Sequence, residues 1–137
     1  MKVSPLKSKI EGPLVIENPP FTDDRGFFSE SFNLEKFKEA GLPTDFTQDN
    51  HSHSKEGVLR GLHFQFDPLQ AKLVWVASGK IFDVIVDCRP RSPTFLEAAN
   101  LIIDRPGLMF LIPEGFAHGF CVLDNKPADV MYKMNSQ

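Results

Sequence analysis

Signals for tight turns recur at short intervals along this chain, and they restrict its fold more strongly than any other feature of the sequence. Short apolar-rich runs separate them, a pattern typical of an antiparallel sandwich or barrel rather than of alternating strands and helices. The sequence therefore predicts an all-β fold. Each signal contains Pro, Gly or both, and they fall at residues 18–20, 23–26, 41–43, 67–68, 78–79, 89–90, 92–93, 105–107 and 113–115.

Length and charge narrow the class of protein further. A chain of 137 residues is expected to form a single domain over residues 1–137 with its own hydrophobic core. The net charge of −3 provides no electrostatic reason to expect nucleic acid or an anionic membrane as a partner. No apolar run reaches signal-peptide or membrane-spanning length, so a cytoplasmic protein is expected.

One segment departs from the β pattern. Leu34, Phe37 and Ala40 follow helical spacing, Asn33 is suited to capping the helix start, and Gly41 is suited to ending it. A short amphipathic helix is therefore expected over 33–41.

The most regular strand signals lie at residues 70–77 and 80–88, and the Ser-Gly pair between them predicts a hairpin. In the second strand Asp83 shares a face with Ile81, Ile85 and Asp87. A carboxylate among aliphatic side chains is either a hydrogen-bonded structural acid or a site residue, and both readings remain open. Cys88 and Cys121 lie in apolar runs and are expected to be small buried hydrophobic residues.

The run 57–65 places Arg60 and His63 in an otherwise apolar strand-like segment. An unpaired buried charge is very costly, so these groups must line a cavity or lie at a solvated rim. Lys72, His118 and Tyr132 each have an ordinary structural explanation when taken singly. Together with Arg60 and His63, they suit proton abstraction from an anionic substrate.

The spacing of Arg60 and His63 raises a geometric difficulty. Residues three apart in a regular strand point to opposite faces, so the two side chains would not share a cavity. Gly61 lies between them and could host a β-bulge. We therefore predict an irregularity at Gly61.

The ordered motifs of this chain resemble those of the dTDP-4-dehydrorhamnose 3,5-epimerase family of deoxysugar biosynthesis. The resemblance extends from about Pro13 to Lys133. It rests on the blocks 24–28 with Glu30, 48–50, 58–65, 70–72, 83–87, 92–95, 112–120 and 132–133.

The resemblance implies a cupin-type jelly roll that forms a homodimer and uses neither metal nor cofactor. It also implies an isomerase that inverts C3, C5 or both in a nucleotide-diphosphate-linked 4-keto-6-deoxyhexose. His63 matches the general base, Tyr132 the acid, and Lys72 a group that stabilises the enolate oxygen; Asp83 is added as a candidate catalytic carboxylate. The expected substrate-binding positions, some reaching across the dimer, are Arg25, Phe28, Glu30, Gln48, Asn50, Arg60, Lys72 and His118.

The sequence also departs from the family pattern. The chain ends at Gln137, whereas family members usually continue with a carboxylate that pairs with the catalytic His and an aromatic residue that stacks on the base. A truncated chain or a short natural variant is therefore expected, in which Asp83 could replace the missing carboxylate. Two alternatives follow: a homologue that binds nucleotide sugars without turnover, or a metal-dependent cupin. The candidate metal ligands are His51, His53, Glu56 and His118.

Overall fold

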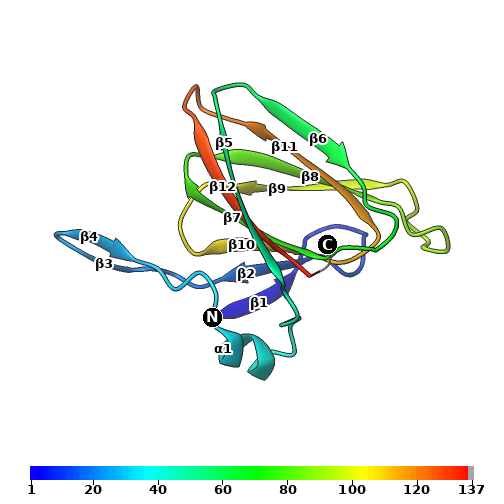
Figure 1. The fold of residues 1–137 in the computed structure, drawn as a ribbon, viewed down its shortest axis with the longest axis horizontal. Helices are drawn as coiled ribbons and strands as arrows, with labels where there is room; N and C mark the ends of the chain where they lie inside the picture. Colours follow the sequence, from blue (N-terminus) through cyan, green and yellow to red (C-terminus); the bar gives the residue numbers. More distant parts are fainter. Residues whose placement is uncertain (136–137) are drawn as a thin grey trace.

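The computed structural model describes residues 1–135, which form twelve strands and one helix, α1, at Leu34–Glu39 (Figure 1). In chain order the strands are β1 (Lys2–Pro5), β2 (Leu14–Glu17), β3 (Phe21–Asp23), β4 (Gly26–Phe28), β5 (Gln48–Ser54), β6 (Leu59–His63), β7 (Lys72–Ser78), β8 (Ile81–Asp87), β9 (Ala98–Ile103), β10 (Leu108–Ile112), β11 (Phe116–Val122) and β12 (Ala128–Met134).

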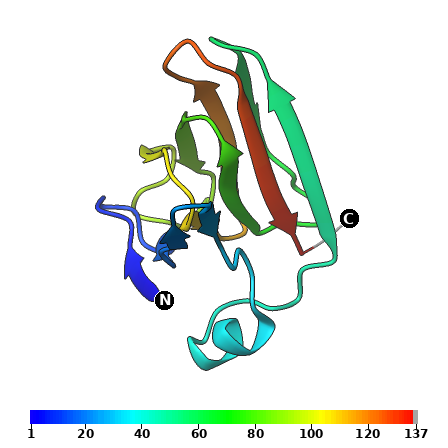
Figure 2. The same ribbon diagram turned by 90° about the vertical axis from the view of Figure 1, so that its left-hand side faces the viewer.

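Two antiparallel sheets make up the body of the molecule (Figures 1 and 2). The larger has the order β1-β2-β10-β7-β12-β5, and the smaller has the order β6-β11-β8-β9. One core cluster joins their facing sides, with Val74 and Phe110 from the larger sheet and Ile85 and Phe120 from the smaller. The expectation of an all-β sandwich is confirmed.

The predicted hairpin between β7 and β8 is wrong. β7 pairs with β10 and β12 in the larger sheet, whereas β8 pairs with β11 and β9 in the smaller. Residues 79–80 therefore carry the chain from one sheet to the other. Alternating side chains and a Ser-Gly turn predict two strands joined by a turn. They do not predict whether the two strands pair with each other in one sheet or lie in opposite sheets across the core. Here the inward faces of both strands bury their aliphatic side chains across the core.

The helix α1 covers part of the second face of the larger sheet. Phe37 of the helix is buried against Leu73 and Met109, whose side chains point away from the space between the sheets. The Asn33 side chain caps the helix by accepting a hydrogen bond from the backbone N–H of Lys36 at 3.0 Å. The predicted helix and its N-terminal cap are confirmed.

Strands β3 and β4 form a separate two-stranded hairpin that extends away from the body of the molecule (Figure 1). Phe21, Phe27 and Phe28 on this hairpin are 76%, 57% and 68% exposed. An isolated two-stranded hairpin is at best marginally stable in water, so contact with a further surface would stabilise this one.

Two further sequence features can be placed. Among residues 1–135, no helix is long and apolar enough to cross a membrane. Cys88 and Cys121 are free thiols and only partly buried, which corrects the expectation that both lie in the core.

Candidate active site

A β-bulge in β6 sets the direction of Arg60 and His63. His63 pairs with His118 of β11 and Arg60 pairs with Phe120, so two residues of β6 oppose the single residue Gly119. Gly61 lies in this bulge with φ +91°, a backbone conformation that favours glycine. The predicted irregularity at Gly61 is confirmed.

The strand register then places four polar side chains of the smaller sheet on its inward face. Residues directly opposite each other in an antiparallel pair share a face. Phe120 belongs to the core, so its partners Arg60 and Asp83 share the inward face. His118, two residues from Phe120, shares that face too, and so does its partner His63.

The larger sheet contributes the facing polar groups. Tyr132 packs against the core between the sheets, and Asn50 lies directly opposite it on β5. Lys72 is two residues from the core residue Val74 on β7, so it shares the same inward face. Gln48 also lies on this face and donates a hydrogen bond to Oδ1 of Asn50 at 3.0 Å. The site thus draws on both sheets.

Asp83 and His118 form a buried pair at the centre of the smaller sheet. The Nε2 atom of His118 lies 2.7 Å from Oδ2 of Asp83, and the side chains are 8% and 0% exposed. Burial raises the pKa of Asp83, and the neighbouring His118 and then Lys72 oppose that rise. The other carboxylate oxygen, Oδ1, has no hydrogen-bond partner among residues 1–135.

Lys72 completes a charged group that spans the two sheets. Its removal from water lowers the pKa of Lys72, and the negative charge of Asp83 acts in the opposite direction. A desolvated ammonium held near a carboxylate is suited to meet a developing oxyanion, because few water molecules screen it.

His63, the proposed base, has no hydrogen-bond partner for its imidazole among the described residues. Asp83 pairs with His118 instead. The suggestion that Asp83 replaces the carboxylate that orients His63 is therefore wrong, because β8 and β6 lie on opposite sides of β11 in the sheet order.

Three expected binding residues lie away from this region of the same chain. Arg25 and Phe28 belong to the projecting hairpin, and Arg25 binds Asp23 at 2.6 Å. Glu30 follows the hairpin and binds Lys36 of α1 at 2.7 Å. Their roles in binding stay a prediction.

The alternative metal site is not assembled. His51 and His53 lie on the outward face of β5 and both contact Asp129, at 2.8 and 3.1 Å. His118 lies on the inward face of the other sheet. Within residues 1–135 no three His, Cys, Asp or Glu side chains are grouped as a metal site.

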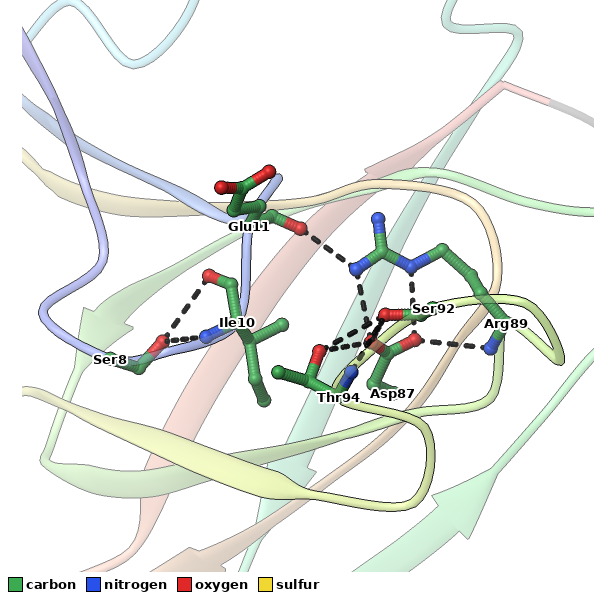
Figure 3. A network of polar contacts seen from close by, with 7 residues as sticks. All are labelled: Ser8, Ile10, Glu11, Asp87, Arg89, Ser92 and Thr94. Carbon is green, nitrogen blue, oxygen red and sulfur yellow. Dashed lines mark hydrogen bonds and ion pairs between the residues drawn. The ribbon is translucent and has the colours of Figure 1, made fainter.

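A second polar network, which the sequence did not reveal, closes the end of β8 (Figure 3). The buried carboxylate of Asp87 accepts hydrogen bonds from Arg89 at 2.9 and 3.0 Å and from the hydroxyls of Ser92 and Thr94 at 2.6 Å each. A surface hollow of about 560 Å³ adjoins this network. Every oxygen of Asp87 is already satisfied, so the network ties the loop 88–97 to the sheet rather than serving a reaction.

Comparison with known proteins agrees with this fold and site. A sequence model of the dTDP-4-dehydrorhamnose 3,5-epimerase family matches residues 7–137. The epimerase of that name from Shigella flexneri is 50% identical over 135 residues, covering 96% of this chain and 74% of its own. The Methanothermobacter thermautotrophicus enzyme is 48% identical over 122 residues, covering 88% of this chain and 66% of its own.

Solved structures show the same arrangement of strands. The Bacillus anthracis dTDP-4-dehydrorhamnose 3,5-epimerase, with TDP and PPi bound, superposes with a TM-score of 0.89 at 41% identity, covering 99% of this chain and 79% of its own. The Legionella pneumophila dTDP-6-deoxy-D-glucose-3,5-epimerase, in complex with dTDP-4-keto-L-rhamnose, has a TM-score of 0.90 at 43% identity, covering 99% and 73%.

The fold is therefore a cupin-type jelly roll with polar groups gathered between its two sheets. The chain belongs to the dTDP-4-dehydrorhamnose 3,5-epimerase family, a family of isomerases that act on nucleotide sugars. It spans about two thirds to three quarters of the length of the two relatives named first. The expected family and fold are confirmed.

Proposed function

We propose that this protein epimerises a nucleotide-diphosphate-linked 4-keto-6-deoxyhexose at C3, C5 or both, with residues 1–137 acting as a single domain. The observation that carries the proposal is the register of the two sheets. It directs His63 from one sheet and Tyr132 from the other toward the same interior space. Inversion of a carbon centre requires an acid and a base on opposite faces of the sugar, and facing sheets supply this arrangement.

In the proposed reaction the His63 imidazole removes the proton from the carbon next to the C4 ketone. The electrons of that C–H bond move to the ketone oxygen and form an enolate. The Lys72 ammonium stabilises the enolate oxygen, and Asp83 favours the charged form of this lysine. Tyr132 then delivers its phenolic proton to the opposite face of the carbon. Exchange with water restores both side chains, so the cycle needs no redox group.

Substrate binding is assigned to a separate set of residues. Arg60 is suited to bind the diphosphate, because a guanidinium can donate two parallel hydrogen bonds. His118 is held by Asp83 at 2.7 Å, which leaves Nδ1 as its second polar atom for the sugar. Asn50 and Gln48 form a hydrogen-bonded pair beside Tyr132 and are assigned to the nucleotide.

Solvent-deuterium incorporation into the 4-keto sugar tests the reaction. The protein is incubated in D2O with dTDP-4-keto-6-deoxyglucose, and mass spectrometry follows deuterium at C3 and C5. We expect exchange that falls at least about 100-fold in His63→Ala. His51→Ala is the matched control, since this histidine lies on the outward face of β5. Absence of exchange with a panel of 4-keto sugars, in folded protein, would contradict the proposal.

A second candidate function is nucleotide-sugar binding without turnover. The observation in its favour is that no residue among 1–135 holds the His63 imidazole by a hydrogen bond, so its orientation and tautomer are not set by this part of the chain. Calorimetry that detects dTDP binding, combined with no deuterium exchange, would favour this function over epimerisation.

We further propose a homodimer in which the β3–β4 hairpin of each copy reaches the site of the other. The exposed phenylalanines of the hairpin support this, as does the projection of the β3–β4 hairpin, with Arg25 in its turn, away from the body of its own chain. Mixing the inactive variants Arg25→Ala and His63→Ala tests it. A hybrid dimer would contain one intact site, so activity should return. No recovery after subunit exchange would contradict shared sites.

A further inference from the structure

A hydrogen bond connects the outermost strands of the two sheets beside the site. β5 is the last strand of the larger sheet, and β6 is the first strand of the smaller. The Nε–H of Arg60 donates to Oγ of Ser54 at 2.6 Å, and Nη2 makes a longer contact of 3.4 Å to the carbonyl oxygen of His53. This short bond spans the side of the sandwich where no strand pairs β5 with β6.

We propose that Ser54 is a positioning residue that aims the Arg60 guanidinium at the diphosphate of the substrate. This inference rests on the function proposed above for Arg60. Ser54 is 2% exposed and lies opposite Ala128, which is fully buried, so its hydroxyl has little freedom to move. Because the Ser54 hydroxyl is held in place on a rigid strand, it also holds in place the guanidinium that donates to it.

The geometry of the guanidinium determines what remains for a ligand. Nε and one hydrogen of Nη2 are directed toward β5 by Ser54 and His53. The Nη1 group and the second hydrogen of Nη2 stay available, and together they can donate two parallel hydrogen bonds to phosphate oxygens. Without the tether, a long exposed side chain must lose its rotamer freedom when the ligand binds.

The same strand offers a matched control. Ser52 lies two residues before Ser54, so it shares the inward face of β5. Its hydroxyl oxygen is buried and has no hydrogen-bond partner among residues 1–135. Ser52→Ala therefore removes a similar hydroxyl from a similar environment without affecting Arg60.

The first test is kinetic and uses the whole protein. We expect Ser54→Ala and Ser54→Cys to raise KM for the 4-keto sugar nucleotide, and Kd for dTDP, by about tenfold. The value of kcat should stay within about twofold, because the tether serves binding rather than the chemical step. The cysteine variant keeps the side-chain volume, which separates hydrogen bonding from packing. Ser52→Ala should leave all three constants unchanged.

A double-mutant cycle decides whether Ser54 acts through Arg60. In an Arg60→Ala background, Ser54→Ala should change Kd for dTDP no further. An equal effect in both backgrounds, or a fall in kcat that matches the rise in KM, would assign Ser54 a merely structural role and overturn the inference.

A readout that is independent of activity separates this inference from the proposed function. The Arg60 Nε–H resonance of the free protein, assigned with Arg60→Lys, should exchange more rapidly with water in Ser54→Ala than in wild type or Ser52→Ala. An unchanged exchange rate of this resonance in Ser54→Ala would contradict the proposal that Ser54 holds Arg60. Failure of deuterium exchange in the wild type would instead contradict the epimerase function. The exchange rate of the Arg60 Nε–H would still show whether Ser54 holds Arg60.

Discussion

The Nε2 atom of His118 lies 2.7 Å from the Oδ2 atom of Asp83, and both residues are buried between the sheets. Because a histidine can stay neutral whereas a buried carboxylate is costly when charged, the two partners are not equivalent. The cost of removing either one therefore depends on which charge is left behind.

The first prediction concerns this asymmetry. His118→Phe leaves the Asp83 carboxylate buried with Lys72 as its remaining charged neighbour, and should lower the free energy of unfolding by about 3 kcal/mol at pH 7. Asp83→Asn removes the buried charge and should change it by less than about 1 kcal/mol. Urea denaturation of both variants and of the double variant measures the coupling. A larger loss in Asp83→Asn than in His118→Phe would contradict this account.

The pH dependence of His118→Phe follows from the sign of the shift. Burial raises the folded-state pKa of Asp83, so the folded protein takes up a proton at a higher pH than the unfolded chain does. The destabilisation by the charged carboxylate is therefore present above the folded-state pKa and disappears as the pH falls. The stability deficit of His118→Phe relative to wild type should shrink as the pH is lowered from 7 toward the unfolded-state pKa of about 4.

The second prediction tests the bulge in β6. A Cβ atom on Gly61 would lie 2.7 Å from the carbonyl oxygen of His118 and 2.9 Å from Cα of Gly119. Gly61→Ala should therefore move β6 relative to β11, displace His63 and Arg60, and lower kcat/KM by about 100-fold or more.

Gly57 provides the control for this substitution. It also has a positive φ, +71°, but a Cβ atom there would meet nothing within 4 Å. Gly57→Ala should cost about 1–2 kcal/mol of stability from the backbone conformation alone and leave kcat/KM nearly unchanged. If both substitutions changed kcat/KM equally, the close approach of the β11 backbone to Gly61 would not be what positions His63 and Arg60.

The third prediction separates the two proton transfers. Tyr132→Phe removes the proposed acid and keeps the aromatic ring that packs against the core. Deuterium should still wash into the substrate through His63, while formation of the inverted product falls by about 100-fold or more. Nuclear magnetic resonance of the recovered sugar distinguishes exchange with retention from inversion. Loss of both exchange and inversion in a folded Tyr132→Phe variant would refute this division of roles.

The fourth prediction concerns Asp87, at the centre of the network in Figure 3. Its hydrogen bonds to Arg89, and then to Ser92 and Thr94, hold the pKa of this carboxyl well below its usual range. A depressed folded-state pKa means that the stabilisation is present above the unfolded value of about 4 and is lost as the pH falls below it. Asp87→Asn should lower the free energy of unfolding by about 3 kcal/mol at pH 7, and by less at pH 2.

An exposed pair of the same chemistry serves as the control for Asp87. Asp23 also accepts hydrogen bonds from Nε and Nη2 of the arginine two residues later, Arg25, but both side chains are largely solvated. Asp23→Asn should leave the urea midpoint almost unchanged, because water screens such pairs. If Asp87→Asn behaved like Asp23→Asn, burial would not be the source of the stabilisation.

Local patterns in the sequence predicted several elements correctly. Turn signals predicted the all-β fold, and the Asn33 cap with its helical spacing predicted α1. Alternation along 81–87 placed Ile81, Asp83, Ile85 and Asp87 on one face of β8, and all four are buried. These features depend on neighbours within a few residues, which is the range over which backbone geometry fixes side-chain direction.

Pairings between distant residues were not predictable in this way. The 78–79 turn looked like a hairpin, yet β7 and β8 belong to different sheets. Ser54 could not be distinguished from Ser52 either. Only Ser54 binds Arg60, which follows it by six residues but belongs to the other sheet. The partner of Asp83 was also missed, because His118 lies 35 residues away and comes to it only through the pairing of β8 with β11.

The amino-acid sequence by itself determined the all-β character of the fold and the position of the helix. It also determined which residue types are available for proton transfer and that a bulge is needed at Gly61. Only the tertiary structure decided that Asp83 holds His118 rather than His63, and that Arg60 is tied to Ser54. Side-chain direction is a local property of the backbone, whereas sheet order depends on how the whole chain buries its apolar faces. Contacts across strands are therefore fixed only when the two sheets close on a common core.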